Sequence, residues 1–257
     1  MRPATSLLGV YGSCWKQVRY GSTTRAGGVS SGEWGTLNLG MNTDDAPERV
    51  LENRRLLTAQ LPAEPLWLRQ VHGVEVCDAD TWNGDTESGV SEAPVADAAV
   101  TTTPGRVLAV LTADCAPVVI ADAEGRALGV AHAGWRGLAA GVLDATLKAL
   151  RTRVPGPAKW CAWVGPCIGQ ARFEVGEDVR SAFVVTNPEA DHYFMPGAAT
   201  GKWQADLAGL VEQRLRGLGV QQVETSGLCT YDRADLFYSY RRNKTTGRLA
   251  TIAWLQA

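Results

Sequence analysis

Three short apolar segments follow one another closely in the middle of the chain, and their spacing constrains the fold more than any other feature. Residues 107–112, 118–121 and 127–132 are rich in valine, leucine and alanine. Such short, branched runs are typical of buried β-strands. The links between them are too short for the helical crossovers that join parallel strands. The sequence therefore predicts a layered α/β (α+β) fold with mixed β-sheets flanked by helices, rather than a purely parallel doubly wound sheet.

Helical periodicity and further apolar runs place the remaining elements. A helix is predicted over residues 47–57, with Asp45 as its cap and Pro47 near its first turn, where the missing N–H is tolerated. Apolar residues at helical spacing predict a second helix over residues 137–150. Other segments have the same patterns, and they predict helices over 179–185 and 206–218 and strands over 66–71, 220–225 and 249–255.

Two polar stretches that contain glycine or proline, residues 83–94 and 187–200, are expected to be loops. Strand-like sequence resumes directly after the first stretch, so neither has the character of a linker between independent domains. With 257 residues and 45% hydrophobic content, the chain can build a sizeable core. We therefore expect one domain that covers residues 1–257.

Charge and hydropathy exclude several classes of protein. The net charge is −2, and the densest basic cluster, Arg241, Arg242 and Lys244, is too short for a polyanion site. No nucleic-acid partner is therefore expected. No apolar run approaches the ~20 residues that cross a bilayer, and no signal peptide is recognisable, so we expect a cytoplasmic protein without a membrane partner. The six cysteines form no CxxC pair and no dense framework, which favours reduced thiols over disulfides or a structural zinc knuckle.

Three residues stand where strand-like runs give way to turns, the position at which catalytic groups often lie. They are His72, Cys115 and His132. Two imidazoles and a thiolate suit zinc and leave a fourth tetrahedral position open, as a catalytic site requires. A zinc ion there would lower the pKa of a bound water and supply a nucleophile. Asp114 is a candidate hydrogen-bond partner for a ligand, whereas His192 is expected to be solvated.

The same atoms allow a second chemistry. Cys115 could act as a nucleophile with His132 as its base. The two interpretations compete for the sulfur, because a thiolate held on zinc has its lone pairs engaged. Each residue also has a purely structural explanation, since a single cysteine or histidine often fills a core position.

Taken together, the motifs resemble those of the laccase-domain family, also called the polyphenol oxidoreductase or peptidoglycan editing factor family. The matching segments cover nearly the whole chain and include Arg25-Ala-Gly-Gly, Leu37-Asn-Leu-Gly, Gln70-Val-His72-Gly, Ala113-Asp-Cys115-Ala-Pro, His132-Ala-Gly-Trp-Arg136-Gly, Gly165-Pro-Cys-Ile-Gly, Glu174-Val-Gly and Phe237-Tyr-Ser-Tyr-Arg241-Arg. The chain departs from the family at residues 170–173, where members often have cysteine, so no essential thiol is expected there.

The resemblance implies zinc on His72, Cys115 and His132, in a fold similar to that of a deamidating toxin with a Cys–His pair. It also implies phosphorolysis of purine nucleosides, including methylthioadenosine, and deamination of adenosine. Bacterial members are linked to editing of peptidoglycan precursors, so an amidase that uses the same zinc is the alternative. A purine nucleoside and phosphate are the expected partners, and a monomer is favoured.

The family name also implies copper-dependent phenol oxidation. A multicopper cluster needs mainly imidazole ligands, and the chain has only three histidines, so zinc is expected before copper. Phosphorolysis requires cationic groups that hold phosphate against the sugar carbon. The candidates for this binding are Arg25, Arg136 and Arg241, which lie in or beside the matched motifs. Glu174 is the candidate proton-transfer residue, besides Cys115 and His132.

Overall fold

The computed structural model describes residues 7–82, 84 and 93–257, whose strands form three sheets. The largest sheet is mixed, with the order β12-β8-β6-β7-β4-β3. Its strands are β3 (Val76–Asp78), β4 (Ala98–Thr101), β6 (Ala116–Asp122), β7 (Leu128–Ala133), β8 (Trp160–Val164) and β12 (Gln222–Thr225). The second sheet, of order β1-β2-β13-β5, is antiparallel and contains β1 (Leu8–Val10), β2 (Val18–Thr23), β5 (Leu108–Thr112) and β13 (Leu249–Leu255).

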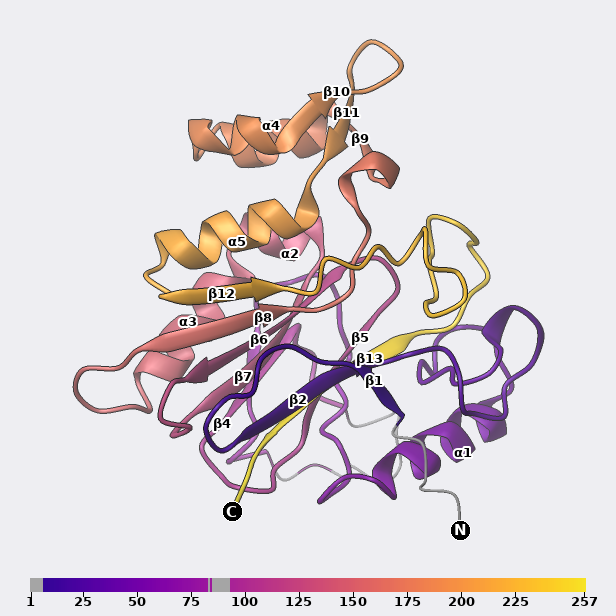
Figure 1. Cartoon of the computed structure of the whole chain (residues 1–257), viewed down its shortest axis with the longest axis vertical. Helices are drawn as coiled ribbons and strands as arrows, with labels where there is room; N and C mark the ends of the chain where they lie inside the picture. The colour runs from indigo at the N-terminus through magenta and orange to yellow at the C-terminus, as the bar shows by residue number, and fades with distance from the viewer. Residues whose placement is uncertain (1–6, 83, 85–92) are drawn as a thin grey trace.

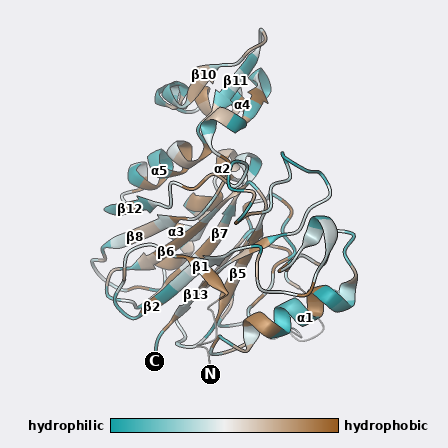
Figure 2. Cartoon of the chain, turned by 45° about the vertical axis from the view of Figure 1, so that its right-hand side comes forward, coloured by the Kyte–Doolittle hydropathy of each residue, from teal (hydrophilic) through white to brown (hydrophobic). Residues whose placement is uncertain are grey.

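These two sheets pack face to face and are covered by helices on their outer faces (Figure 1). Fully buried side chains such as Val110, Val119 and Trp163 fill the space between the sheets. The outer face of the largest sheet packs against α3 (Val142–Arg151) and α5 (Leu207–Gly217), while α1 (Pro47–Thr58) packs against the second sheet. The central strands are mainly hydrophobic, whereas α1 carries both kinds of residue (Figure 2). The predicted fold class is therefore confirmed.

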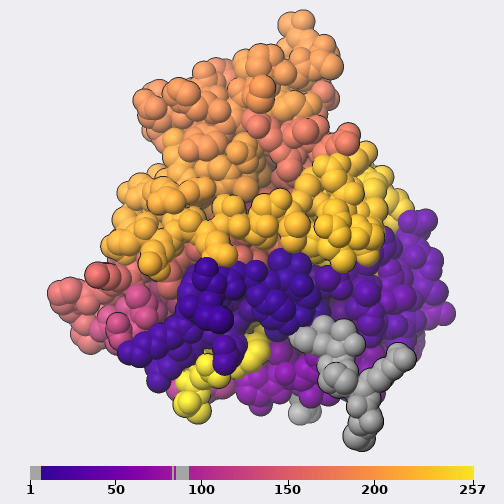
Figure 3. All heavy atoms as spheres, in the orientation of Figure 1, coloured from indigo at the N-terminus to yellow at the C-terminus, as the bar shows by residue number. Residues whose placement is uncertain are grey.

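A small antiparallel sheet lies at one end of the molecule, in orange at the top of Figure 3. It consists of β9 (Glu174–Gly176), β11 (Lys202–Ala205) and β10 (Phe194–Pro196), and it packs with α4 (Glu177–Val184) and the 3₁₀ helix η3 (Pro188–Tyr193). The stretch 187–200 was expected to be a loop. It contains η3 and β10 instead, because Phe194 joins Phe183 of α4 in the core and gives the segment an apolar anchor.

Two helix predictions need correction. The cap of α1 is Ala46, not Asp45, whose carboxylate accepts hydrogen bonds from Ser30 and Asn38 and so holds the preceding loop. The single helix predicted over 137–150 is two helices, α2 (Trp135–Ala140) and α3. They meet at Gly141, whose φ of +100° ends α2 in the left-handed conformation that glycine adopts at low cost.

Residues 66–71 were expected to be a strand, but they make only isolated bridges, Leu66 to Leu108 and Arg69 to Val95. Short apolar sequence was therefore not sufficient for sheet pairing there. The loop predicted over 83–94 lies for the most part outside the described residues. Two more 3₁₀ helices, η1 (Gly32–Trp34) and η2 (Gln170–Arg172), lie in the described chain. No helix among residues 7–82, 84 and 93–257 combines the length and hydrophobicity needed to cross a membrane.

The three closely spaced apolar segments in the middle of the chain do not all pair with one another. β6 and β7 form an antiparallel pair, with Pro117 opposite His132. β5, however, belongs to the second sheet, where it pairs with β13. The chain therefore passes from one sheet to the other at Ala113–Cys115, and this change of sheet places Cys115 beside the end of β7.

Candidate metal centre

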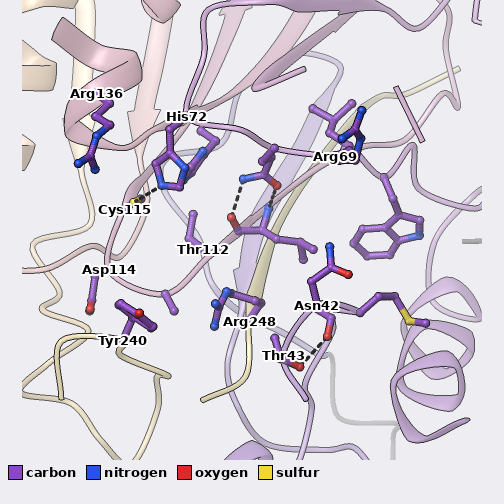
Figure 4. Close-up of a pocket in the computed structure, with 18 of the residues that line it drawn as sticks. Asn42, Thr43, Arg69, His72, Thr112, Asp114, Cys115, Arg136, Tyr240 and Arg248 are labelled. Carbon is purple, nitrogen blue, oxygen red and sulfur yellow. Dashed lines mark hydrogen bonds between the residues drawn. The ribbon is translucent and has the colours of Figure 1, made fainter. Parts of the chain in front are cut away.

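His72, Cys115 and His132 come together, as the sequence predicted. One candidate ligand atom from each lies within 4.8 Å of the others. The sulfur of Cys115 is 3.9 Å from Nε2 of His72, and the two imidazole rings are 4.8 Å apart at 74°. His72 lies in the loop before β3, Cys115 between β5 and β6, and His132 in β7. In Figure 4 the Cys115 and His72 side chains point toward each other.

Two residues of the site have left-handed backbones without being glycine. His72 has a φ of +61° and Asp114 a φ of +95°. Such conformations cost of the order of 1–3 kcal/mol and persist where the surroundings enforce them. Asp114 is held by the hydroxyl of Thr230, at 2.6 Å, and the backbone N–H of Arg241, at 2.7 Å. The prediction that Asp114 bonds a ligand is therefore wrong, because its carboxylate fixes the turn that presents Cys115.

The residue that hydrogen-bonds the candidate ligand His132 is Asp97, which was not predicted from the sequence. Its carboxylate is fully buried and accepts a hydrogen bond from Nδ1 of His132 at 2.8 Å. It also accepts hydrogen bonds from the backbone N–H groups of Val71, His72 and Gly73. One signal could have identified it, namely a single acidic residue inside the apolar run 95–100.

Electrostatics favour the thiolate form of Cys115. Burial on its own raises the pKa of this thiol, but the charge of His132 and hydrogen bonds from both histidines outweigh it and lower the pKa to about 6. Burial likewise opposes the charged form of His132, yet the Cys115 thiolate and Asp97 raise its pKa to about 9. Cys115 is therefore ionised at neutral pH, as a metal ligand or a nucleophile must be. Metal binding at His132 would release a proton.

The space between the ligands depends on Gly134. A Cβ atom at this position would lie 2.9 Å from Cδ2 of His72 and 3.0 Å from the sulfur of Cys115. The absence of a side chain at Gly134 therefore leaves room for the His72 ring and the Cys115 sulfur to lie close together. Among the described residues, three side chains that could bind a metal lie together here, and no fourth joins them. Two nitrogens, one sulfur and an open position fit a catalytic zinc site.

Replacing Gly134 with alanine tests this fit. Its φ of −67° and ψ of 155° suit alanine, so we expect the new methyl group to act on the ligands rather than on the backbone. We expect zinc affinity to fall about tenfold or more, with about 1–3 kcal/mol lost from the free energy of unfolding. Gly217→Ala is the matched control, because a Cβ there meets nothing within 4 Å. Equal zinc affinity in both variants would show that Gly134 does not shape the site.

The three residues lie in the wall of a cavity of about 840 Å³. The described lining contains one acidic residue, Asp114, and six cations, which are Arg54, Arg69, Arg136, Arg241, Lys244 and Arg248. The whole chain has a net charge of −2, so the positive charge is concentrated here. Such a lining favours an anionic ligand.

Arg136 and Arg241, two of the predicted substrate-binding residues, line this cavity. Arg136 is exposed and packs on the ring of Trp135. In Figure 4 it lies on the same side of the pocket as His72. The guanidinium of Arg241 donates to the carbonyl of Glu174 and lies over the ring of Phe173.

Arg248 also lines the cavity and was not predicted from the sequence. Its guanidinium donates to the carbonyls of Thr246 and Gly247. No carboxylate of the described residues forms an ion pair with it, and burial lowers its pKa. A partly buried cation that faces a cavity without a carboxylate partner is a natural anion ligand.

Two other candidates are not brought to the cavity. Arg25 donates to the carbonyls of Gly35 and Ala234 and stacks on Tyr238. Glu174 has an exposed side chain at the start of β9. Neither belongs to the described cavity lining, so the arrangement gives no support to their predicted roles. His192 is exposed on η3, as expected of a solvated histidine.

Comparison with known proteins decides the family. The model of the multi-copper polyphenol oxidoreductase laccase family matches residues 19–256. The chain belongs to this family. A purine nucleoside phosphorylase of Pseudomonas aeruginosa is 47% identical over 240 residues, which are 93% of this chain and 94% of that protein. The purine nucleoside phosphorylase YfiH of Escherichia coli is 43% identical over 93% of this chain and 95% of its own length.

Solved structures agree with this assignment. The crystal structure of a Neisseria meningitidis protein of the DUF152 family matches with a TM-score of 0.84 and 42% identity, over 94% of this chain and 95% of that one. YlmD from Geobacillus stearothermophilus matches with a TM-score of 0.85 and 27% identity, over 98% and 100% of the two chains. The resemblance read from the sequence motifs is thus confirmed.

The multicopper centre implied by the family's name does not fit this site. Of the chain's three histidines, only His72 and His132 are at the centre, while His192 is exposed on η3. A multicopper centre needs several copper ions held mainly by imidazole. Two imidazoles and one thiolate can hold a single ion.

Proposed function

We propose that this protein is a zinc-dependent purine nucleoside phosphorylase that also deaminates adenosine. The observation that carries the proposal is the position of a His–Cys–His group in the wall of a cation-lined cavity. His72, Cys115 and His132 would hold the zinc ion, which supplies Lewis acidity and a lowered pKa for water. Curated relatives at 43–47% identity bear the name purine nucleoside phosphorylase, which supports this substrate class.

Different side chains of the cavity would bind the phosphate and the purine. Arg136, Arg241 and Arg248 supply planar guanidinium groups, which match the oxygens of phosphate in paired hydrogen bonds. Aromatic and apolar side chains line the same space and suit a purine ring, among them Trp135, Ile168, Phe173 and Tyr240. Phosphate and nucleoside would therefore meet in one cavity beside the metal ligands, which lowers the entropic cost of bringing them together. Inosine, adenosine and methylthioadenosine are the expected substrates.

We further propose that the chain works as a monomeric single domain in the cytoplasm. The three candidate metal ligands already meet within a single chain, and this supports the monomer. Small molecules, rather than nucleic acid or a membrane, are the proposed partners.

An amidase that edits peptidoglycan precursors is the alternative. A cavity of about 840 Å³ lies in the upper part of the usual range for small-molecule sites, so a ligand larger than a nucleoside also fits. The open metal position would suit attack on an amide carbonyl as well as on a purine ring.

Incubation of the zinc-loaded protein with inosine and adenosine, with and without phosphate, tests the proposal. We expect free purine base and ribose 1-phosphate to appear only when phosphate is present, and inosine to form from adenosine without it. A peptidoglycan precursor is assayed in parallel, and the products are followed by mass. Cleavage of the precursor's amide bond, with no change in either nucleoside, would contradict the phosphorylase and support the amidase.

A further inference from the structure

We propose that Asp97 is the positioning residue for both histidines of the metal centre. The inference rests on the metal-binding part of the proposed function. Asp97 precedes β4 and is not itself a candidate metal ligand, because its carboxylate is already occupied by four donors. Through these bonds it determines which nitrogen of His132 faces Cys115 and holds the turn that presents His72.

The first part of the role concerns the ring of His132. An ionised carboxylate can only accept hydrogen bonds, so Nδ1 of His132, at 2.8 Å from Oδ1 of Asp97, must carry the proton. Nε2 is then left with its lone pair on the side of the ring away from Asp97, where a metal can bind. The backbone N–H of His132 also donates to the carbonyl of Asp97 at 2.7 Å, so the residue is held at two points.

The second part concerns the loop of His72. Three consecutive N–H groups point at the same carboxylate: Val71 at 3.0 Å, His72 at 3.0 Å and Gly73 at 2.7 Å. His72 has a φ of +61°, a conformation that a residue other than glycine adopts only when its surroundings enforce it. The carboxylate provides that enforcement, because it pairs three donors that the turn would otherwise leave without acceptors.

Both oxygens of the Asp97 carboxylate are fully occupied by hydrogen-bond donors. Oδ1 accepts from His132 and His72, and Oδ2 accepts from Val71 and Gly73, which matches the roughly four acceptor positions of an ionised carboxylate. An asparagine has one acceptor oxygen and would turn donor hydrogens toward two of these four groups. With its oxygen toward His132, the asparagine of Asp97→Asn would leave the N–H groups of Val71 and Gly73 unpaired. With its amide nitrogen there instead, it would reverse the protonation of the His132 ring and leave the N–H of His72 unpaired.

The experiment compares Asp97→Asn with a matched control, Asp122→Asn. Asp122 is also a buried carboxylate that accepts two backbone N–H bonds and two side-chain bonds from Arg126, but it serves the turn after β6. We expect competition with a chromophoric chelator to show zinc affinity reduced about 10- to 100-fold in Asp97→Asn and unchanged in Asp122→Asn. Thermal melting reports whether each variant folds. Zinc affinity within twofold of wild type in folded Asp97→Asn would overturn the proposal.

A measurement on the unaltered protein covers the case in which Asp97→Asn does not fold. Long-range ¹H–¹⁵N NMR of the zinc-loaded wild type should show His132 protonated at Nδ1 and metal-bound at Nε2. Metal on Nδ1, or a proton on Nε2, would overturn the proposal. These readouts do not require turnover, so a protein that shows this pattern but leaves nucleosides unchanged would refute the phosphorylase and not the role of Asp97.

Discussion

Cys115→Ala is expected to remove bound zinc and nucleoside turnover together. Wild-type protein should carry about one zinc ion per chain, as an open catalytic site does. Without the thiolate only two imidazoles remain, and the variant should retain less than about a tenth of the metal under the same purification. Elemental analysis measures the zinc, and the phosphorolysis assay measures the activity.

Cys14→Ala provides the control, because Cys14 is an exposed cysteine outside the described cavity lining. It should keep both the metal and the activity. A Cys115→Ala protein with full zinc and no activity would favour the other chemistry, in which Cys115 attacks the substrate and His132, oriented by Asp97, accepts its proton. The low pKa of Cys115, about 6, is compatible with either role, so metal content is the decisive readout.

Arg136→Ala is expected to raise the phosphate concentration needed for half-maximal phosphorolysis by about 10- to 100-fold, the loss of about 1.5–3 kcal/mol from a charged hydrogen bond. Arg136 is exposed at the cavity, and its only described ring contact is with Trp135, so its removal should leave the fold intact. Zinc content should not change. Adenosine deamination, which needs no phosphate, should fall far less than phosphorolysis.

Arg216→Ala is a suitable control for this experiment, because Arg216 pairs with Glu212 on α5 and does not belong to the described cavity lining. Equal loss of both reactions in Arg136→Ala would instead mean that Arg136 supports the common site. If Arg136→Ala loses neither phosphorolysis nor deamination, Arg241 and Arg248 remain as the proposed anion ligands. Arg248→Ala should then show the phosphate effect on its own.

The sequence determined the local elements and the chemistry of the centre. β13 was predicted with its observed bounds, and α1, α5, β6 and β7 with small errors at their ends, because the spacing of apolar residues reports which side of a segment is buried. His72, Cys115 and His132 were identifiable because few residues of the chain have soft or imidazole donors. The family motifs around them are short continuous segments, so they can be recognised directly in the sequence.

Only the tertiary structure decided which distant residues meet. β5 pairs with β13, more than 130 positions away, rather than with β6, and no local pattern specifies such a pairing. The same non-local contacts bring Asp97 within hydrogen-bond distance of both histidines and direct Asp114 toward Thr230. They also place Arg248 in the cavity wall and leave Arg25 outside the described lining. An isolated aspartate or arginine looks the same in sequence whether it binds a ligand, a turn or solvent, because its role depends on the partners that folding brings to it.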